Sequence, residues 1–139
     1  LVYSIYSYVT SFRDAGLFVV YAGCDGSNAA EVVRLVMASL ADIKAKGVTE
    51  TELKRAKDQM KGNLMLSVES TSNRMSQLAK QEIYFGRHFS LQNILDDMDR
   101  VETGRVHALA NRLFAQGQIG LSVLGPVSKK EFPDDVLAC

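Results

Sequence analysis

The pattern of apolar and polar residues predicts strands at both ends of the chain and helices between them. Residues 1–12 and 17–23 are rich in β-branched and aromatic side chains, as strands require. The residues between them, Arg13–Gly16, have the composition of a turn. Residues 119–124 form another short apolar run before a Gly-Pro pair. We therefore predict an antiparallel hairpin at the start and one further strand near the end.

Apolar residues three or four positions apart predict the helices. The predicted ranges are about 28–46, 50–69, 72–85, 91–100 and 104–115. A polar cluster, Ser70–Asn73, separates the second range from the third, which leaves open two helices or one bent helix. The residues predicted to cap helices are Asn28 (with Glu31), Thr49 (with Glu52), Ser90 and Thr103.

The same spacing predicts which helix faces are buried. On the first helix the inward residues are Val32, Val33, Val36, Leu40 and Ile43. On the next two they are Leu53, Met60, Leu64, Met75, Leu78 and Ile83. Lys57 is assigned to the opposite, solvent-facing side of its helix.

A strand that follows some ninety residues of helix can rejoin the sheet only if the helices form a layer on it. This order predicts an α+β two-layer sandwich, in which the hairpin and a returning C-terminal strand are covered by four to five helices. We assign residues 1–127 to this domain and 128–139 to a loosely held tail. Because the sequence opens at Leu1 in the middle of a predicted strand, we expect a fragment of a longer protein.

Composition narrows the function classes. Sixteen basic and sixteen acidic residues give a net charge of zero, which argues against non-specific binding to nucleic acid or anionic membranes. The longest apolar run, residues 17–24, is too short to cross a bilayer. Cys24 and Cys139 are far apart and outside any C-x-x-C pattern, so free thiols in a reducing compartment are favoured over a disulfide. We therefore expect a cytoplasmic protein.

Motifs for catalysis are missing from the sequence. An H-x-x-E-H zinc helix needs two histidines four residues apart, but His88 and His107 are the only histidines and neither begins that motif. We expect His88 in a loop and His107 on a helix surface. There is no G-x-S-x-G or S-x-x-K sequence and no phosphate-binding glycine loop. We predict no catalytic residue, no metal ligand and no cofactor in this chain.

Four tyrosines are concentrated in the predicted hairpin. They could form a stacking platform for bases or sugars, but aromatic cross-strand packing is the favoured interpretation in so neutral a chain. The four are Tyr3, Tyr6, Tyr8 and Tyr21.

Three stretches that follow one another between residues 1 and 127 resemble the late part of the insulinase/pitrilysin zinc metallopeptidases, and the resemblance extends over nearly the whole chain. They are LVYSIYSYVTSFRDAGLFVVYAGC, ELKRAKDQMKGNLMLSVESTSNRMSQLAKQEIYFG and IGLSVLGPV. The short bacterial enzymes that are similar to the mitochondrial processing peptidase are the best match. The resemblance implies a LuxS/processing-peptidase-like half-domain of a parent with two related halves that enclose peptide substrates in a chamber. Zinc, its ligands and the general base would belong to the N-terminal half.

The resemblance also assigns one substrate-binding residue. In the family, an arginine and, seven residues later, a tyrosine in a Gly-Leu-x-Tyr-Ser context bind a backbone carbonyl of the substrate. Leu1-Val2-Tyr3-Ser4 fits that context, so Tyr3 is the candidate, and the arginine would fall before Leu1. An uncharged phenol suits this role because it can donate to an oxygen that gains negative charge. The alternative is that Tyr3 is only a strand aromatic.

Three functions remain open at this point. The first is the non-zinc-binding part of a zinc metalloendopeptidase, with the N-terminal half and a peptide as partners, inactive alone. The second is part of a non-catalytic subunit of a two-protein processing protease, and the third is an interaction module unrelated to proteolysis. In every case an unpaired edge of the hairpin would favour self-association of the fragment, as a homodimer.

Overall fold

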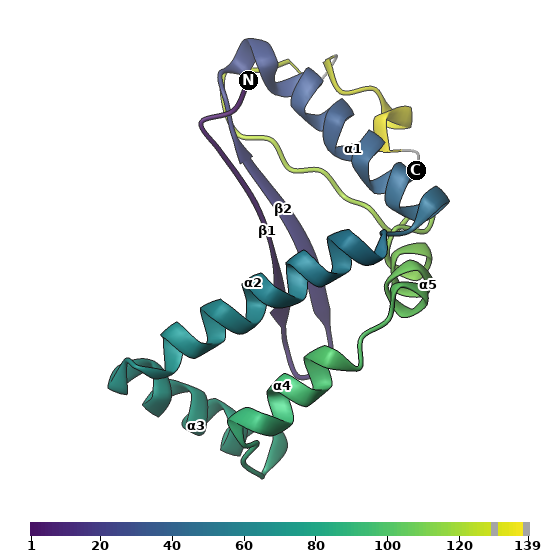
Figure 1. Cartoon of the computed structure of the whole chain (residues 1–139). Coiled ribbons are helices and arrows are strands. Elements are labelled where there is room, and N and C mark those ends of the chain that lie inside the picture. Colours follow the sequence, from purple (N-terminus) through teal and green to yellow (C-terminus); the bar gives the residue numbers. More distant parts are fainter. Residues whose placement is uncertain (129–130, 138–139) are drawn as a thin grey trace. The chain divides into compact units, whose positions relative to one another are not determined.

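The computed structural model describes residues 1–128 and 131–137, and its secondary structure confirms the α+β class. The chain divides into two compact units (Figure 1). Unit 1 comprises residues 1–47 and 107–139, and unit 2 comprises residues 48–106.

Unit 1 contains the predicted hairpin. Strands β1 (Ser4–Ser11) and β2 (Gly16–Gly23) pair antiparallel, with Ser4 opposite Gly23 and Ser11 opposite Gly16. Tyr6 lies directly opposite Tyr21, and their rings stack with centroids 5.0 Å apart. This contact supports the cross-strand packing interpretation of the tyrosines.

The hairpin leads into helix α1 through a single turn of 3-10 helix, η1 (Gly26–Asn28). Asp25 caps this turn by accepting a hydrogen bond from the Ser27 amide at 2.9 Å. The predicted cap by Asn28 is wrong: its backbone is already helical (φ −99°, ψ −7°), and its side chain makes no capping bond. The side chain of Glu31 pairs with Arg34 rather than turning back to the cap.

Helix α1 (Ala29–Lys46) carries most of the buried residues in the part of unit 1 that the structure describes. Ala29, Val32 and Met37 are buried, and the predicted inward residues Val33, Val36, Leu40 and Ile43 are half-buried. The predicted buried face of α1 is therefore correct, although Met37 was not predicted to lie on it. The helix ends at Gly47, whose positive φ of 72° is a conformation that glycine adopts without strain.

Helices α2 (Glu50–Val68), α3 (Thr71–Phe85) and α4 (Leu91–Asp99) make up most of unit 2. The capping box at Thr49 and Glu52 is confirmed: the Glu52 amide donates to Thr49 Oγ1 at 3.2 Å, and the Thr49 amide donates to Glu52 Oε2 at 2.8 Å. Ser70 caps α3, so the 50–85 region forms two helices. Ser90 caps α4 as predicted.

Helix α5 (Thr103–Leu113) crosses from unit 2 into unit 1. Thr103 lies within its first turn instead of preceding it, and the Thr103 hydroxyl donates to Glu50 at 3.0 Å. Ala110 on this helix and Phe114 just after it are buried, and the Phe114 ring lies 5.6 Å from that of Phe18.

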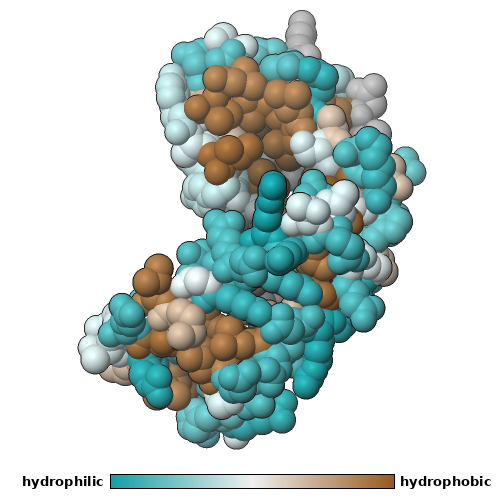
Figure 2. All heavy atoms as spheres, in the orientation of Figure 1, coloured by the Kyte–Doolittle hydropathy of each residue, from teal (hydrophilic) through white to brown (hydrophobic). Residues whose placement is uncertain are grey.

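Burial in unit 2 differs from the prediction. Leu53 and Leu64 are half-buried, but Met60, Met75, Leu78 and Ile83 are exposed. Figure 2 shows apolar side chains gathered over the region of α2 and α3. The reason is size: a unit of 59 residues, with no strand among those described, encloses too little volume to cover these faces.

The predicted last strand is not formed by the described residues. Residues 119–124 are not part of a sheet, and the described sheet has two strands only. Gly117 and Gly120 flank the start of the run, and glycine weakens a strand because it contributes no side-chain packing. Of the predicted tail, residues 134–137 form a 3-10 turn, η3 (Asp134–Leu137), that contacts α1, and Cys139 lies outside the described residues.

Candidate functional site

Tyr3 is held at the entrance of β1 by its backbone. Its amide donates to the carbonyl oxygen of Gly23 at 2.7 Å, one residue beyond the first pair of the ladder. The side chain is 81% exposed. The hydroxyl has no hydrogen-bond partner among the described residues. This arrangement fixes the position of the Cα atom and leaves the phenol open to a ligand.

The neighbouring tyrosines lie further along the hairpin. The ring of Tyr6 stacks on Tyr21 and lies 6.0 Å from the ring of Tyr8. All three rings are about half exposed. Because the Tyr6 and Tyr21 rings pack on each other while Tyr3 lies outside their cluster, Tyr3 differs from them in having its ring free.

The two histidines lie in different units and have different surroundings. His88 is exposed in the loop before α4, with Nε2 3.6 Å from Glu82 Oε2. His107 is half-buried, and its Nε2 donates to the carbonyl oxygen of Lys44 at 2.7 Å. The loop position of His88 is as predicted. The predicted surface position of His107 is wrong, because its ring packs against the C-terminal end of α1.

No zinc site can be assembled from the residues described here. Among them, no group of three or more His, Cys, Asp or Glu side chains could hold a metal ion. Cys24 is half-buried with a free thiol. The residues present therefore do not fit the family's catalytic zinc.

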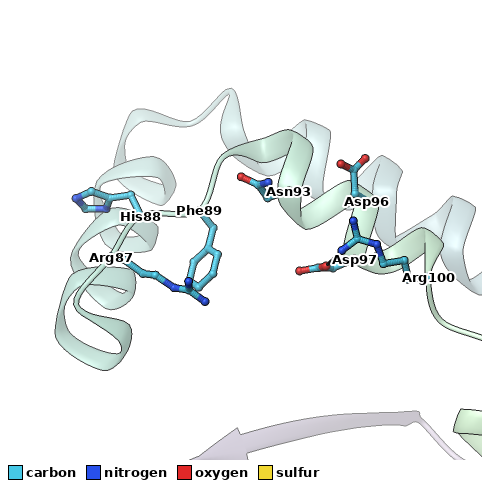
Figure 3. A pocket seen from close by; sticks show the side chains of 7 residues that line it. All are labelled: Arg87, His88, Phe89, Asn93, Asp96, Asp97 and Arg100. Carbon is cyan, nitrogen blue, oxygen red and sulfur yellow. Dashed lines mark hydrogen bonds and ion pairs between the residues drawn. The ribbon is translucent and has the colours of Figure 1, made fainter.

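A cleft of about 270 Å³ in unit 2 is lined by Arg87, His88, Phe89, Asn93, Asp96, Asp97 and Arg100 (Figure 3). Arg87 lies over the ring of Phe89, 4.6 Å from its centroid. Arg100 pairs with Asp97 at 2.9 Å, and Gln92 donates to Asp96 at 2.7 Å. Asn93 is used in the cap of α4. Because these polar groups already bind one another, we assign the cleft no chemistry.

The charged groups with shifted pKa values are all at the surface. The hydrogen bond from Lys61 lowers the pKa of Asp99, and the bond from Arg34 lowers the pKa of Glu31. Hydrogen bonds from Ser27 lower the pKa of Asp25. These are local ion pairs and caps, and none of them forms a pair of carboxylates with opposite shifts that would serve acid–base catalysis.

Comparison with known proteins finds a similar domain and similar relatives. Residues 1–60 match the domain described as the peptidase M16 inactive domain. The zinc protease YmxG of Bacillus subtilis is 37% identical over 126 residues, which are 91% of this chain and 31% of that protein. The chain is thus similar to the M16 inactive domain over residues 1–60 and to zinc proteases over nearly its whole length. This confirms the resemblance to the insulinase/pitrilysin metallopeptidases.

Two further relatives are similar over nearly the whole chain. The zinc protease Rv2782c of Mycobacterium tuberculosis is 36% identical over 139 residues, covering 99% of this chain and 32% of that protein. A probable mitochondrial-processing peptidase subunit beta of Arabidopsis thaliana is 27% identical and covers 94% of this chain and 24% of that protein. The chain thus spans about a third or less of the length of these relatives.

A solved structure supports the fold. A chain of complex III2 from Candida albicans, with Inz-5 bound, superposes with a TM-score of 0.72 over 80% of this chain and 27% of its own length, at 22% identity. The likeness shows that this arrangement of strands and helices occurs within a longer chain. Among the described residues, no helix is long and apolar enough to cross a membrane.

The Tyr3 candidate came from sequence context alone. The substrate-binding role of Tyr3 stays a prediction. The role of His107 was missed because its partner, Lys44, is 63 residues away and no local pattern signals the contact.

Proposed function

We propose that this chain is the C-terminal, non-zinc-binding part of a zinc metalloendopeptidase that cleaves peptides in the cytoplasm. The N-terminal half of the parent supplies zinc, its ligands and the general base. This part contributes a section of the chamber wall and grips the substrate through Tyr3. By itself it is inactive.

The observation that carries the proposal is the combination of a fixed backbone and a free side chain at Tyr3. The 2.7 Å bond to Gly23 orders the main chain, while the ring is 81% exposed. A phenol so placed can donate to the carbonyl oxygen of a bound peptide, and that bond strengthens as the oxygen gains negative charge in the transition state. The names of the relatives, zinc proteases and a processing peptidase subunit, support a peptide as the substrate.

The test is Tyr3→Phe in a longer protein that joins this chain to a zinc-binding half. We expect kcat for a fluorogenic peptide to fall on the order of 10²-fold, the low end for loss of one transition-state donor. Tyr8→Phe is the matched control, because Tyr8 is an exposed tyrosine of the same hairpin, and its kinetics should be unchanged. Equal kinetics for Tyr3→Phe and the unmodified protein would leave Tyr3 as a structural residue.

A second measurement tests whether this chain alone binds zinc or cleaves peptides. The isolated 139-residue chain should retain no stoichiometric zinc after dialysis and should cleave no peptide, because its residues offer no ligand set. One tightly held zinc per chain would contradict the proposal that zinc binds only to the N-terminal half. A parent without H-x-x-E-H in its other half would favour the alternative, a non-catalytic subunit of a two-protein protease.

A further inference from the structure

Gly23 ends strand β2 and holds the backbone of Tyr3. Its carbonyl oxygen accepts the hydrogen bond from the Tyr3 amide at 2.7 Å, and Gly23 is also the partner of Ser4 in the first pair of the ladder. The end of a ladder opens more readily than its middle, because it has neighbours on one side only. A tyrosine that binds substrate from this position therefore depends on further support at the strand end.

The backbone conformation of Gly23 does not require glycine. Gly23 lies within a strand, and it is not one of the described glycines with positive φ. A residue with a side chain would suit this conformation, and in a strand it would be favoured over glycine. What distinguishes glycine here is the space that a side chain would occupy.

Two neighbouring side chains border that space. A Cβ atom added to Gly23 would lie 3.3 Å from Ser4 Oγ, which is closer than most contacts of real Cβ atoms. It would lie 3.6 Å from the hydroxyl oxygen and 3.8 Å from Cε1 of Tyr21. Tyr21 precedes Gly23 by two residues, so both face the same side of the hairpin. The tip of the Tyr21 ring therefore lies close to the backbone of Gly23, and a larger side chain there would displace it.

The Tyr21 ring is held in this direction by a second ring. Tyr21 lies opposite Tyr6 in the ladder, and the two rings stack with centroids 5.0 Å apart. Aromatic pairs across two strands stabilise the sheet that they cover. A series of contacts thus leads from the Tyr6 ring, through Tyr21 and Gly23, to the backbone of Tyr3.

We propose that Gly23 and Tyr21 are positioning residues for Tyr3. Glycine leaves room for the Tyr21 ring over the end of β2, and the ring packs on that end so that the hydrogen bond from the Tyr3 amide stays formed. The position of a group that touches substrate matters on a small scale, because a displacement of about 1 Å can cost on the order of 10²-fold in rate. This inference rests on the proposed role of Tyr3 in binding the substrate.

The first test measures hydrogen exchange of the Tyr3 amide by NMR in the 139-residue chain. Gly23→Val places methyl groups against the Tyr21 ring, and Tyr21→Leu removes the ring. We expect exchange of the Tyr3 amide to become about tenfold faster or more in each variant. The amide of Phe12, which donates to the Ala15 carbonyl oxygen at 2.8 Å at the other end of the hairpin, is the internal reference and should not change.

Each variant has a matched control in the same hairpin. Gly16→Val makes the same change at the first residue of β2, where the nearest atom to an added Cβ would be the Thr10 carbonyl oxygen, at 3.6 Å. Tyr8→Leu removes another exposed ring, which lies 6.0 Å from that of Tyr6. Neither control should speed exchange of the Tyr3 amide.

Three results of this test would overturn the proposal. The first is unchanged exchange of the Tyr3 amide in Gly23→Val or in Tyr21→Leu. The second is an equal acceleration at Phe12, which would mean that the whole hairpin has loosened. The third is an equal acceleration in the two control variants.

The second test is kinetic and uses the longer protein that joins this chain to a zinc-binding half. Gly23→Val should lower kcat for the fluorogenic peptide about tenfold or more, and it should have no further effect in the Tyr3→Phe protein, because both changes remove the same contact. Equal factors in the two backgrounds would overturn the positioning role. If Tyr3→Phe leaves kcat unchanged while the exchange results hold, the proposed substrate contact is wrong and the support of the Tyr3 backbone stands.

Discussion

The Nε2 of His107 donates a hydrogen bond to the main-chain carbonyl oxygen of Lys44 at 2.7 Å. Lys44 lies in the last turn of α1, where carbonyl groups have no partner within the helix. The side-chain amide of Asn111, one turn further along α5, donates to the same oxygen at 3.3 Å. Gly47 closes the arrangement, since a Cβ added there would lie 3.4 Å from His107 Cβ. Helix α5 therefore caps the end of α1.

From this contact we predict that His107→Ala lowers the free energy of unfolding by about 1–2 kcal/mol, the sum of one buried hydrogen bond and some packing. The measurement is urea denaturation followed by circular dichroism. The chain supplies its own control in His88, which is exposed in a loop. His88→Ala should change the stability by less than about 0.5 kcal/mol. Equal effects of the two substitutions would show that the contact with Lys44 adds nothing.

Lys57 is a second residue whose role differs from the prediction. Its Nζ donates to the carbonyl oxygen of Asp99 at 3.0 Å and to that of Val101. Asp99 is the last residue of α4 and Val101 lies two residues beyond it. A positive charge is favourable at this end of the helix because of the helix dipole. The sequence pattern had assigned Lys57 to the solvent side, and with it a negligible effect of substitution.

We now expect Lys57→Ala to cost about 1–2 kcal/mol, since hydrogen bonds to charged groups contribute more than neutral ones. Lys54→Ala, on the same helix and exposed, is the control and should stay within about 0.5 kcal/mol. Thermal and urea unfolding of both variants provide the comparison. If Lys54→Ala cost as much as Lys57→Ala, helix propensity and not the bonds to α4 would explain the loss.

The ion pair between Lys61 and Asp99 predicts a pH effect in unit 2. The two side chains are 2.6 Å apart, and the bond from Lys61 lowers the pKa of Asp99 below its ordinary value of 3.8. A carboxyl whose pKa is lower in the folded state stabilises the fold above its unfolded pKa. That contribution is lost as the pH falls through the folded pKa. The change therefore falls below about pH 4.

The direct measurement is an NMR titration of the Asp99 carboxyl carbon. In the unmodified chain its midpoint should lie below that of the same carboxyl in Lys61→Met, where the pKa should return toward 3.8. Coincident Asp99 curves in the two proteins would mean that the pair does not persist in solution.

Local sequence signals predicted most of this fold, and long-range contacts account for what they missed. The boundaries of α2, α3 and α4 follow from Thr49, Ser70 and Ser90, whose side chains bond to amides within three residues. Such caps depend on neighbours along the chain, so the sequence contains the whole signal.

The predictions that were wrong concern residues whose burial or contacts depend on parts of the protein far away in the sequence. Met60 and Ile83 have the spacing of core residues, yet they are exposed because nothing in the described chain covers them. His107 and Lys57 find their partners 63 and 42 to 44 residues away. The predicted cap at Asn28 is wrong for a different reason: Asn28 is the last residue of the 3-10 turn η1, so its backbone is already helical. Tyr3 could be singled out only by family resemblance, since its own residue pattern is that of a strand.

The last prediction concerns association of the isolated chain. Strand β1 exposes apolar side chains, among them Ile5 and Val9 at 52% and 69%, and its outer edge is unpaired in the described chain.

We therefore predict that the chain forms a homodimer through β1 at micromolar concentration, by strand addition or by packing of this face. Val9→Lys should shift the midpoint of dimerisation about tenfold or more upward, because each dimer would bring two lysines to the contact. Leu66→Lys, at a residue 68% exposed on α2, is the matched control and should leave the midpoint unchanged. Light scattering over a dilution series measures both. A chain that stays monomeric at high micromolar concentration, with slow hydrogen exchange in β1, would show that this edge is protected without a partner.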